Sequence, residues 1–409
     1  MNNKGSLAIT VMVIFVLSAL SAAFLMRGVA ERWNTGRVVK SSAALWAAEA
    51  GVQKAMWENV YNNCAGMTRT AGNTLCNGNK TMAGTLAGYG DYDVTLDSTN
   101  AIIQSVGSVP SRTDPKKVTR RVQANLAKPA IFAFGMFAQG KVTVSNNALV
   151  DAFNSSTGIY GGTNIDHSHG SVGSNGTSAG IVEVDNNANV WGDVSTGPGG
   201  SVTNSGNIHG QITNANSVAL PAVVVPATLT GLASQGALTL GQKGTRTLTA
   251  GDYKYSNISL GNKAVLTISG NVRLYLTGDA SKNALVSGNA SETTISVASG
   301  GSLTIYTDGV VNLNNNNVIN TLSQKPKDFL IYSTYTGANG VAVSNNATSY
   351  MAIYAPQTDV SASNNAGLYG AVVGKTASLN NNGDIHFDMA LAGLANPFES
   401  VIVTNWREY

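Results

Sequence analysis

Pairs of adjacent asparagines, separated by short apolar segments, recur from about residue 131 onward, and no other feature restricts the fold as strongly. The first asparagine of the last three copies is residue 345, 364 and 380, so these copies lie 19 and 16 residues apart. Such a spacing suits one coil of a parallel β-helix. The copies occupy residues 144–148, 184–188, 343–347, 363–366 and 379–382.

Asparagine suits the corners of such a coil, because it tolerates the left-handed backbone conformation that tight corners need. Its side chain can also join a hydrogen-bonded ladder with the asparagine of the next coil. The Val, Leu, Ile and Ala residues between corners would fill the interior, and each coil needs its neighbours to bury them. The sequence therefore predicts a mainly β chain with a parallel β-helix over residues 131–391.

Two segments leave this repeat. Residues 216–250 contain Pro221 and Pro226 and then a Gly- and Thr-rich stretch, so we expect a connection or insertion between two β-helical blocks. Residues 392–409 end in Trp406-Arg407-Glu408-Tyr409, and we expect this C-terminal tail to cap the open end of the β-helix or to dock on its side.

The N-terminal region is different in kind. Residues 7–26 contain no charged side chain and are long enough to cross a bilayer as a helix. A secretory signal peptide has its small-residue cleavage site after the apolar core, whereas Gly5 and Ser6 come before it. We interpret residues 1–5 as a leader, and cleavage between Gly5 and Ser6 would leave the hydrophobic helix at the mature N-terminus.

Apolar residues continue at helical spacing beyond Arg27, at Val38, Leu45, Val52 and Met56. This pattern predicts one helix over residues 6–60, roughly 80 Å long at about 1.5 Å per residue. Its first part is apolar on all sides and suits lipid or a bundle of similar helices. Its second half is amphipathic and can pack on a globular head.

The alternating pattern within residues 61–130 predicts a small antiparallel β region, with strands at 91–96, 102–109 and 118–126. The region carries a basic cluster of Lys116, Lys117, Arg120 and Arg121. This cluster has two interpretations: contact with DNA or an acidic surface, or edge-strand charge that blocks unwanted pairing. The net charge of the chain is only +3 and is spread out, so we expect no nucleic acid partner.

The two cysteines, Cys64 and Cys76, follow the predicted helix in a loop rich in Gly, Asn and Thr. In an exported chain such a pair suggests a disulfide, and the alternative is two free thiols. Export is consistent with the composition, because charged residues make up 11% of the 409 residues, against roughly 25% in an average soluble protein. The chain also contains 45 glycines. Together these features favour an exported, repetitive β architecture over a cytosolic enzyme.

Candidate chemistry is sparse. Asp166, His167 and His169 lie within four residues and could contribute ligands to a divalent metal, and the alternative is a polar loop. Sugar-cleaving β-helical enzymes use paired carboxylates. The acids Asp151, Glu183, Asp185 and Asp193 are sparse and fall on different predicted coils, where two of them could still meet by stacking. There is no nucleotide-binding loop and no serine elbow. We expect no enzymatic activity and no cofactor.

Residues 6–58 resemble the N-terminal region of PilX-type minor pilins, and the segment Ala43-Ala44-Leu45-Trp46-Ala47-Ala48-Glu49-Ala50-Gly51 carries the resemblance. The resemblance implies processing by prepilin peptidase, methylation at Ser6, and assembly with other pilin subunits by an inner-membrane machinery. Major pilins usually have glutamate at the fifth mature position, which here is Thr10. This departure favours a tip or low-copy role.

The β region resembles a repeat domain that often follows PilX-type N-termini in bacterial proteins of unknown function, on residues 352–356, 368–374 and 385–388. We therefore expect a minor type IV pilin-like subunit, first a single-pass inner-membrane protein in contact with lipid and then part of a pilus or a secretion pseudopilus. Two alternatives remain: an adhesin or carbohydrate-binding protein with a surface or glycan ligand, and a membrane-tethered structural protein.

Overall fold

The computed structural model describes residues 3–61, 68–69, 80–97, 101–127, 130–287, 292–320, 322–394, 397–398 and 402–409. Within these ranges it leaves out the side chains of residues 3–12, 14, 59–61, 68–69, 127 and 402–404. The chain divides into two compact units: unit 1, residues 1–129 and 400–409, and unit 2, residues 130–399. The mainly β fold, with one long N-terminal helix and parallel β-helical sheets, is confirmed.

Unit 1 consists of one long helix and an antiparallel sheet of six strands in the order β1-β2-β3-β4-β5-β32. Its elements are α1 (Asn3–Tyr61), β1 (Thr68–Arg69), β2 (Lys80–Leu86), β3 (Gly90–Asp97), β4 (Ile102–Val109), β5 (Val118–Ala127) and β32 (Ile402–Glu408). The C-terminal half of α1 packs on the sheet, where Ala48, Val52 and Ala55 are buried against residues such as Val94 and Ile103.

Gly107 on β4 lets the backbone of α1 approach the sheet closely. A Cβ atom at this position would lie 1.9 Å from the carbonyl oxygen of Ala44 and 2.7 Å from the backbone nitrogen of Ala48. The small residues Ala44 and Ala48 of the helix meet the glycine, so backbone packs on backbone. This contact sets the distance between the helix and the sheet.

The N-terminal half of α1 has no packing partner in the part of the chain that the structure describes. Every described side chain from Val13 to Lys40 is exposed, including Phe24 and Trp33. Among the described residues, we find no helix that combines the length and the apolarity needed to cross a membrane. The span expected at residues 7–26 begins in residues 7–12, whose side chains lie outside that set.

The C-terminal tail divides between the two units. Phe398 packs against Tyr332 and Tyr354 on the side of the β-helix, as one of our two alternatives predicts. Strand β32 corrects the rest of that expectation. It pairs antiparallel with β5 in unit 1, with Ile402 opposite Ala127 and Glu408 opposite Val122, and is not the cap of the β-helix. The pairing satisfies the backbone groups along the outer edge of β5, which would otherwise be an open edge. Unit 2 is therefore inserted in the sequence between two neighbouring strands of unit 1.

Unit 2 is a parallel β-helix built in two blocks. The first block contains β6 (Met136–Ala138), β7 (Val142–Val144), β8 (Leu149–Phe153), β9 (Val172–Ser174), β10 (Val182–Val184), β11 (Asn189–Val190), β12 (Val194–Ser195), β13 (Val202–Asn204), β14 (Asn207–Ile208) and β15 (Ile212–Thr213). The 3-10 turn η1 (Gly162–Asn164) lies in the long loop between β8 and β9.

The second block follows a crossing segment, residues 214–237, which contains α2 (Ala227–Thr230). Its strands are β16 (Leu238–Leu240), β17 (Thr245–Tyr255), β18 (Ile258–Leu260), β19 (Val265–Leu276), β20 (Asn283–Val286), β21 (Thr294–Val297), β22 (Ser302–Thr307), β23 (Val310–Leu313), β24 (Val318–Ile319), β25 (Phe329–Ser333), β26 (Val341–Ser344), β27 (Thr348–Ala355), β28 (Val360–Ser363), β29 (Gly367–Gly374), β30 (Ala377–Asn380) and β31 (Asp384–Asp388). Two 3-10 turns, η2 (Pro326–Asp328) and η3 (Met389–Gly393), complete it.

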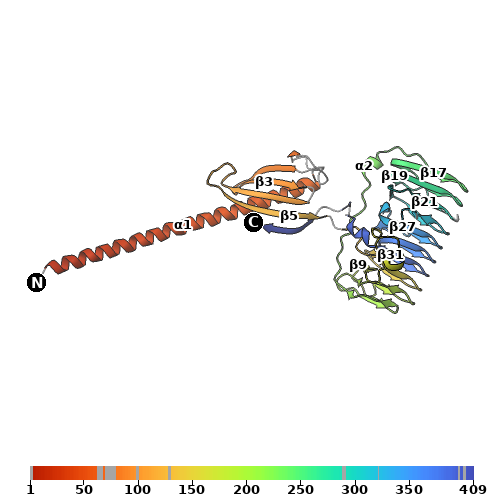
Figure 1. Cartoon of the computed structure of the whole chain (residues 1–409), viewed down its shortest axis with the longest axis horizontal. Helices are drawn as coiled ribbons and strands as arrows, with labels where there is room; N and C mark the ends of the chain where they lie inside the picture. Colours follow the sequence, from red (N-terminus) through yellow and green to blue (C-terminus); the bar gives the residue numbers. More distant parts are fainter. Residues whose placement is uncertain are drawn as a thin grey trace. The chain divides into compact units, whose positions relative to one another are not determined.

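The order of rungs in space differs from their order in sequence. The last rung, β30 and β31, pairs in parallel with the first rung, β7 and β8. The chain thus starts in the middle of the β-helix, builds to one end, crosses to the other end and builds back (Figure 1). The connection expected at 216–250 ends earlier than we predicted, because residues 238–240 and 245–250 already belong to β16 and β17.

The asparagine corners are confirmed. Both asparagines of each pair have a positive φ, between 47° and 62°. Their side chains form a ladder of Nδ2–H···Oδ1 bonds along the rungs, at 3.1–3.4 Å. The ladder runs through Asn186, Asn146, Asn381, Asn364, Asn345 and Asn315. In the copy at 379–382 the corner is Asn381 and not Asn380, which ends β30, so the true spacings are 19 and 17 residues.

We expect Gly107→Ala to destabilise unit 1 by about 3 kcal/mol or more, because the added methyl group would overlap the backbone of α1. Thermal unfolding of the full chain, followed by the helical circular dichroism signal, measures this. Gly28→Ala is the matched control, since nothing lies within 4 Å of its Cβ position. Equal melting temperatures for the two variants would contradict the close packing.

Candidate functional site

All four histidines of the chain lie on or beside one outward-facing column of unit 2. Outward positions of a β-helix stack from rung to rung, because side chains alternate along each strand. Tyr350, Tyr369, His386 and Asp151 are successive partners in the parallel register of β27, β29, β31 and β8. The column continues with Trp191 and His209, each one residue after the paired Val190 and Ile208. We call these six residues the ring column.

The centre of the ring column is a buried hydrogen-bonded cluster. The Nδ1 atom of His386 lies 2.6 Å from Oδ1 of Asp151, and both side chains are almost fully buried. Tyr160, from the loop between β8 and β9, donates its hydroxyl to Oδ2 of the same carboxylate at 2.7 Å. Its ring packs at 4.0 Å from the His386 ring and 5.3 Å from that of Tyr369. Each oxygen of the buried carboxylate therefore has a partner.

Burial and the neighbouring Asp151 carboxylate raise the pKa of Tyr160 well above its usual range. Burial likewise raises the pKa of Asp384, with the Asp151 carboxylate adding to the effect and His386 opposing it. The same loop is anchored a second time, since Asp388 accepts hydrogen bonds from the backbone and the hydroxyl of Ser155 at 2.8 and 2.6 Å. The cluster thus holds the loop of residues 154–170 against the β-helix.

At its exposed end the ring column has a stacked pair of rings, and a third ring from the loop packs on this pair at a tilt. The Trp191 and His209 rings are parallel at 3.5 Å between centroids, and His167 packs on Trp191 at 4.6 Å. Trp191 is half-buried, whereas both histidines are exposed. Stacking of this kind contributes about 0.5–1.5 kcal/mol per pair. His167 therefore serves as a contact between the loop and the ring column.

The predicted metal trio does not converge. Asp166 accepts hydrogen bonds from Ser168 and from Nδ1 of His169 at 3.0 Å, whereas His167 turns to Trp191. Partial burial of Asp166 is outweighed by these hydrogen bonds, which lower the pKa of its carboxyl group to about 2. Among the residues that the structure describes, no group of three or more His, Cys, Asp or Glu side chains is placed to hold a metal ion.

The acids of the first coils have separate surroundings. Glu183 pairs with Lys141 at 2.9 Å, and Asp193 accepts the backbone N–H of Gln211 at 2.8 Å. Asp151 is held by His386 and Tyr160, whereas the backbone N–H of Asp185 donates to the Val144 carbonyl. None of these contacts joins two carboxylates. The absence of an enzymatic activity stays a prediction.

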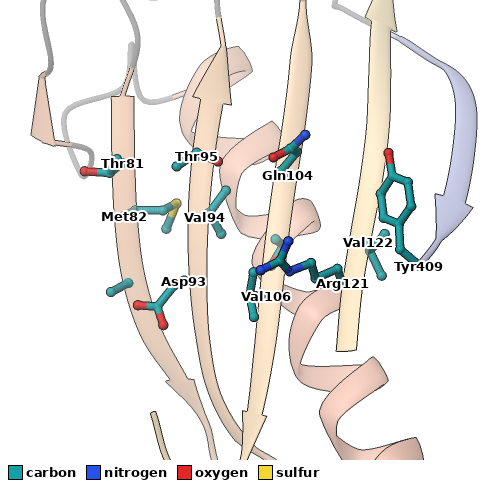
Figure 2. Close-up of a pocket in the computed structure, with 12 residues that line it drawn as sticks. Thr81, Met82, Asp93, Val94, Thr95, Gln104, Val106, Arg121, Val122 and Tyr409 are labelled. Carbon is teal, nitrogen blue, oxygen red and sulfur yellow. The ribbon is translucent and has the colours of Figure 1, made fainter. Parts of the chain in front are cut away.

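Unit 1 carries a shallow groove of about 760 Å³ across strands β2 to β5. Figure 2 shows Thr95, Gln104 and Arg121 on the face of the sheet turned away from α1, with Tyr409 at the side of β5. Gln104 donates to Gln123 at 3.2 Å, and the Tyr409 hydroxyl donates to the same amide oxygen. The groove is lined by both apolar residues, such as Met82 and Val106, and polar residues.

Lys116 and Lys117 of the predicted basic cluster lie in the turn before β5, whereas Arg120 and Arg121 lie on two faces of that strand, because neighbouring residues of a strand point in opposite directions. Arg121 lines the groove. Arg120 instead pairs with Glu408 at 3.1 Å and donates to the Ser41 hydroxyl at 2.7 Å. The cluster is therefore not one continuous cationic surface.

Three further predicted features depend on residues that the structure does not describe in full. Gly5, Ser6 and Thr10 lie in α1, but their side chains are outside the described residues. The processing site and the assembly position therefore stay predictions. Cys64 and Cys76 both lie outside the described residues, so the disulfide also stays a prediction.

The chain has limited similarity to known proteins. Residues 204–394 match the model of a domain of unknown function, DUF7305, which falls within unit 2. No curated protein matches the chain.

Two solved structures resemble parts of the chain. One is an ice-binding protein from the Antarctic ascomycete Antarctomyces psychrotrophicus, at 17% identity, covering 62% of this chain and 94% of that one. The other is the competence-associated pilin ComZ from Thermus thermophilus, at 12% identity, covering 90% of this chain and 97% of that one. Both have a TM-score of 0.26, which does not establish a shared fold.

Our sequence analysis did not predict the ring column, although the spacing within the repeat indicates it. Each of Tyr350, Tyr369, His386, Asp151 and Trp191 lies five residues after the first corner asparagine of its own rung. Aligning the copies on Asn381 instead of Asn380 places His386 in this column. Tyr160 has no such signal, because it comes from a loop outside the repeat.

We expect Tyr160→Phe to cost about 1–3 kcal/mol, because it leaves one oxygen of a buried carboxylate without its donor. The raised pKa of Tyr160 means that the unfolded chain loses this phenolic proton first. Its contribution to stability is therefore complete below about pH 10 and falls as the pH rises further.

Thermal unfolding by near-ultraviolet circular dichroism at about pH 7 and about pH 11 measures both effects of this change. The control is Tyr335→Phe, a half-buried tyrosine of unit 2 outside the cluster. We expect the Tyr160 variant to be less stable than the control at neutral pH and to lose less stability in alkali than the parent chain. An unchanged alkaline profile would contradict the cluster.

Proposed function

We propose that this chain is a pilin-like subunit, which enters a helical filament through the free half of α1 and displays the β-helix of unit 2. The observation that carries the proposal is the long exposed half of an otherwise packed helix. Phe15, Phe24, Leu25, Met26 and Trp33 are each at least 70% exposed. Large apolar side chains at this density need a partner, since contiguous exposed apolar surface marks an interaction site.

The sequence of this half supports a helical partner. It is apolar on all sides up to Met26, as expected of a helix that is surrounded by other apolar helices or by lipid. The first charged residues after this apolar stretch, Arg27 and Glu31, pair with each other at 3.1 Å on the helix surface. We propose that lipid covers this surface before assembly, and that the equivalent helices of other pilin subunits cover it afterwards.

The topology of unit 1 supports the same function. A long helix followed directly by the antiparallel strands β2 to β5 is the arrangement that the resemblance to PilX-type pilins implies. The 270 residues of unit 2 are inserted between β5 and β32, so the head can grow without a change in the helix. A head of this size and the Thr10 position favour a low-copy place at the tip.

The proposal is tested by Phe24→Glu in cells that assemble filaments. Placing a carboxylate among apolar helices costs several kcal/mol, which corresponds to a loss of tenfold or more in incorporation. The amount of the chain in sheared filaments, relative to the whole cell, measures incorporation. Ile159→Glu is the matched control, because Ile159 is also an exposed apolar residue but lies in unit 2. Equal incorporation of both variants would reject the proposal.

A second candidate function, binding to an ordered surface or glycan, is favoured by one face of unit 2. The outward column of the ten-stranded sheet is almost free of charge, and Glu183 is its one acid. In register it contains Thr203, Glu183, Thr143, Ser378, Ser361, Ala342, Asn312, Val286, Ser259 and Thr239. Small polar side chains at the rung spacing of about 4.8 Å present a flat, regular array.

Sedimentation of the purified chain with insoluble polysaccharides tests this second candidate. We expect the parent chain to bind and the double variant Ser361→Lys with Ser378→Lys to bind at least tenfold more weakly, because two long cations would interrupt the flat face. Ser281→Lys, at an exposed loop position, is the control. A parent chain that stays in the supernatant, or a double variant that binds equally, would exclude this function.

A further inference from the structure

The two ends of the β-helix are different. At one end lie β13, β14 and β15, and we call residues 201–213 the open rung. No residue of the open rung is buried. Each of its three strands pairs with a neighbour on one side alone in the described structure. This end is drawn as the yellow-green strands of unit 2 in Figure 1, opposite the end that carries β17.

The interior of the β-helix is uncovered at the open rung. One rung further in, Val182, Val190 and Val194 are fully buried. Their register partners in the open rung are Val202, Ile208 and Ile212, in the same order. Ile212 is 54% exposed, against 0% for Val194 directly above it. Val202 and Ile208 are half-buried. A core that ends in one exposed isoleucine and two half-buried apolar residues resembles an interface without its partner.

The opposite end is closed and charged. Its inward residues Leu240, Leu248 and Tyr255 are buried. Arg246, Asp252 and Lys254 lie on the terminal strand β17, and charged side chains on an edge strand discourage pairing with another chain. By contrast, the sequence contains no Asp, Glu, Lys or Arg between Asp193 and Lys243. The open rung therefore lacks the charged side chains that protect exposed edges.

We propose that the open rung is the docking surface for the open rung of a second copy of this chain. A partner must present backbone groups that match three short strands arranged around one coil. An identical rung presents the same three strands in the same arrangement. A twofold axis across the end brings the strands together antiparallel, so that their free backbone groups can pair. It also brings the apolar ends of the two cores into contact. The absence of charge means that this self-association meets no repulsion.

The proposal goes beyond filament assembly, because it uses unit 2 and not α1. A photocrosslinking amino acid, p-benzoylphenylalanine, is placed at Thr203 in the full chain in detergent. The matched control has the same amino acid at Thr239. These residues are the two ends of the same outward column, and both are exposed. We expect a crosslinked product of twice the 42.2 kDa chain mass from position 203 and none from position 239.

Mass spectrometry of the crosslinked peptides should place the contact within residues 201–215 of the second copy. Ile212→Lys in the position 203 background should reduce the product at least tenfold, whereas Ile159→Lys, at a comparably exposed isoleucine, should not. Association through α1 alone would persist in both variants and would leave position 203 uncrosslinked. No dimer from position 203, a crosslink to residues 238–255, or a crosslink to a different protein would each overturn the proposal.

Discussion

The left-handed corner is the constraint on which the whole of unit 2 depends. Two consecutive asparagines with positive φ form the corner in six described rungs, and most L-residues pay about 1–2 kcal/mol for this conformation. Asparagine meets the requirement and adds a side chain that bonds to the next rung. The corner also fixes the register, so everything at a constant distance from it stacks. The ring column is a consequence of that register.

The spatial order of the rungs then determines where the chain enters and leaves unit 2. Because β30 and β31 return to pair with β7 and β8, the β-helix ends close to where it began. The backbone N–H of Ile131 donates to the carbonyl of Leu394 at 3.0 Å, which joins the entry and exit of unit 2. An insertion with adjacent ends fits between two paired strands, and β5 and β32 are such strands.

Local features could be predicted from the sequence and non-local ones could not. The asparagine pairs carry their own conformational requirement, so the β-helix and its corners follow from residues such as Asn345 and Asn346. The division of α1 into a free and a packed part follows from its pattern, but the packed part begins near Ser41 and not at Arg27, because Val38 is 64% exposed. The pairing of β32 with β5 could not be predicted, because a seven-residue strand has no signal for its partner. The Asp151–His386 contact joins residues 235 positions apart, and only the rung order brings them together.

The central claim is that the free half of α1 is an assembly surface. Its most direct test is mass spectrometry of the chain recovered from purified filaments, which reports both incorporation and the first residue. The account predicts that the chain is present at low copy and begins at Ser6. Absence of the chain from filaments of cells that express it, or a filament-free chain that still begins at Met1 in cells with an active prepilin peptidase, would contradict it.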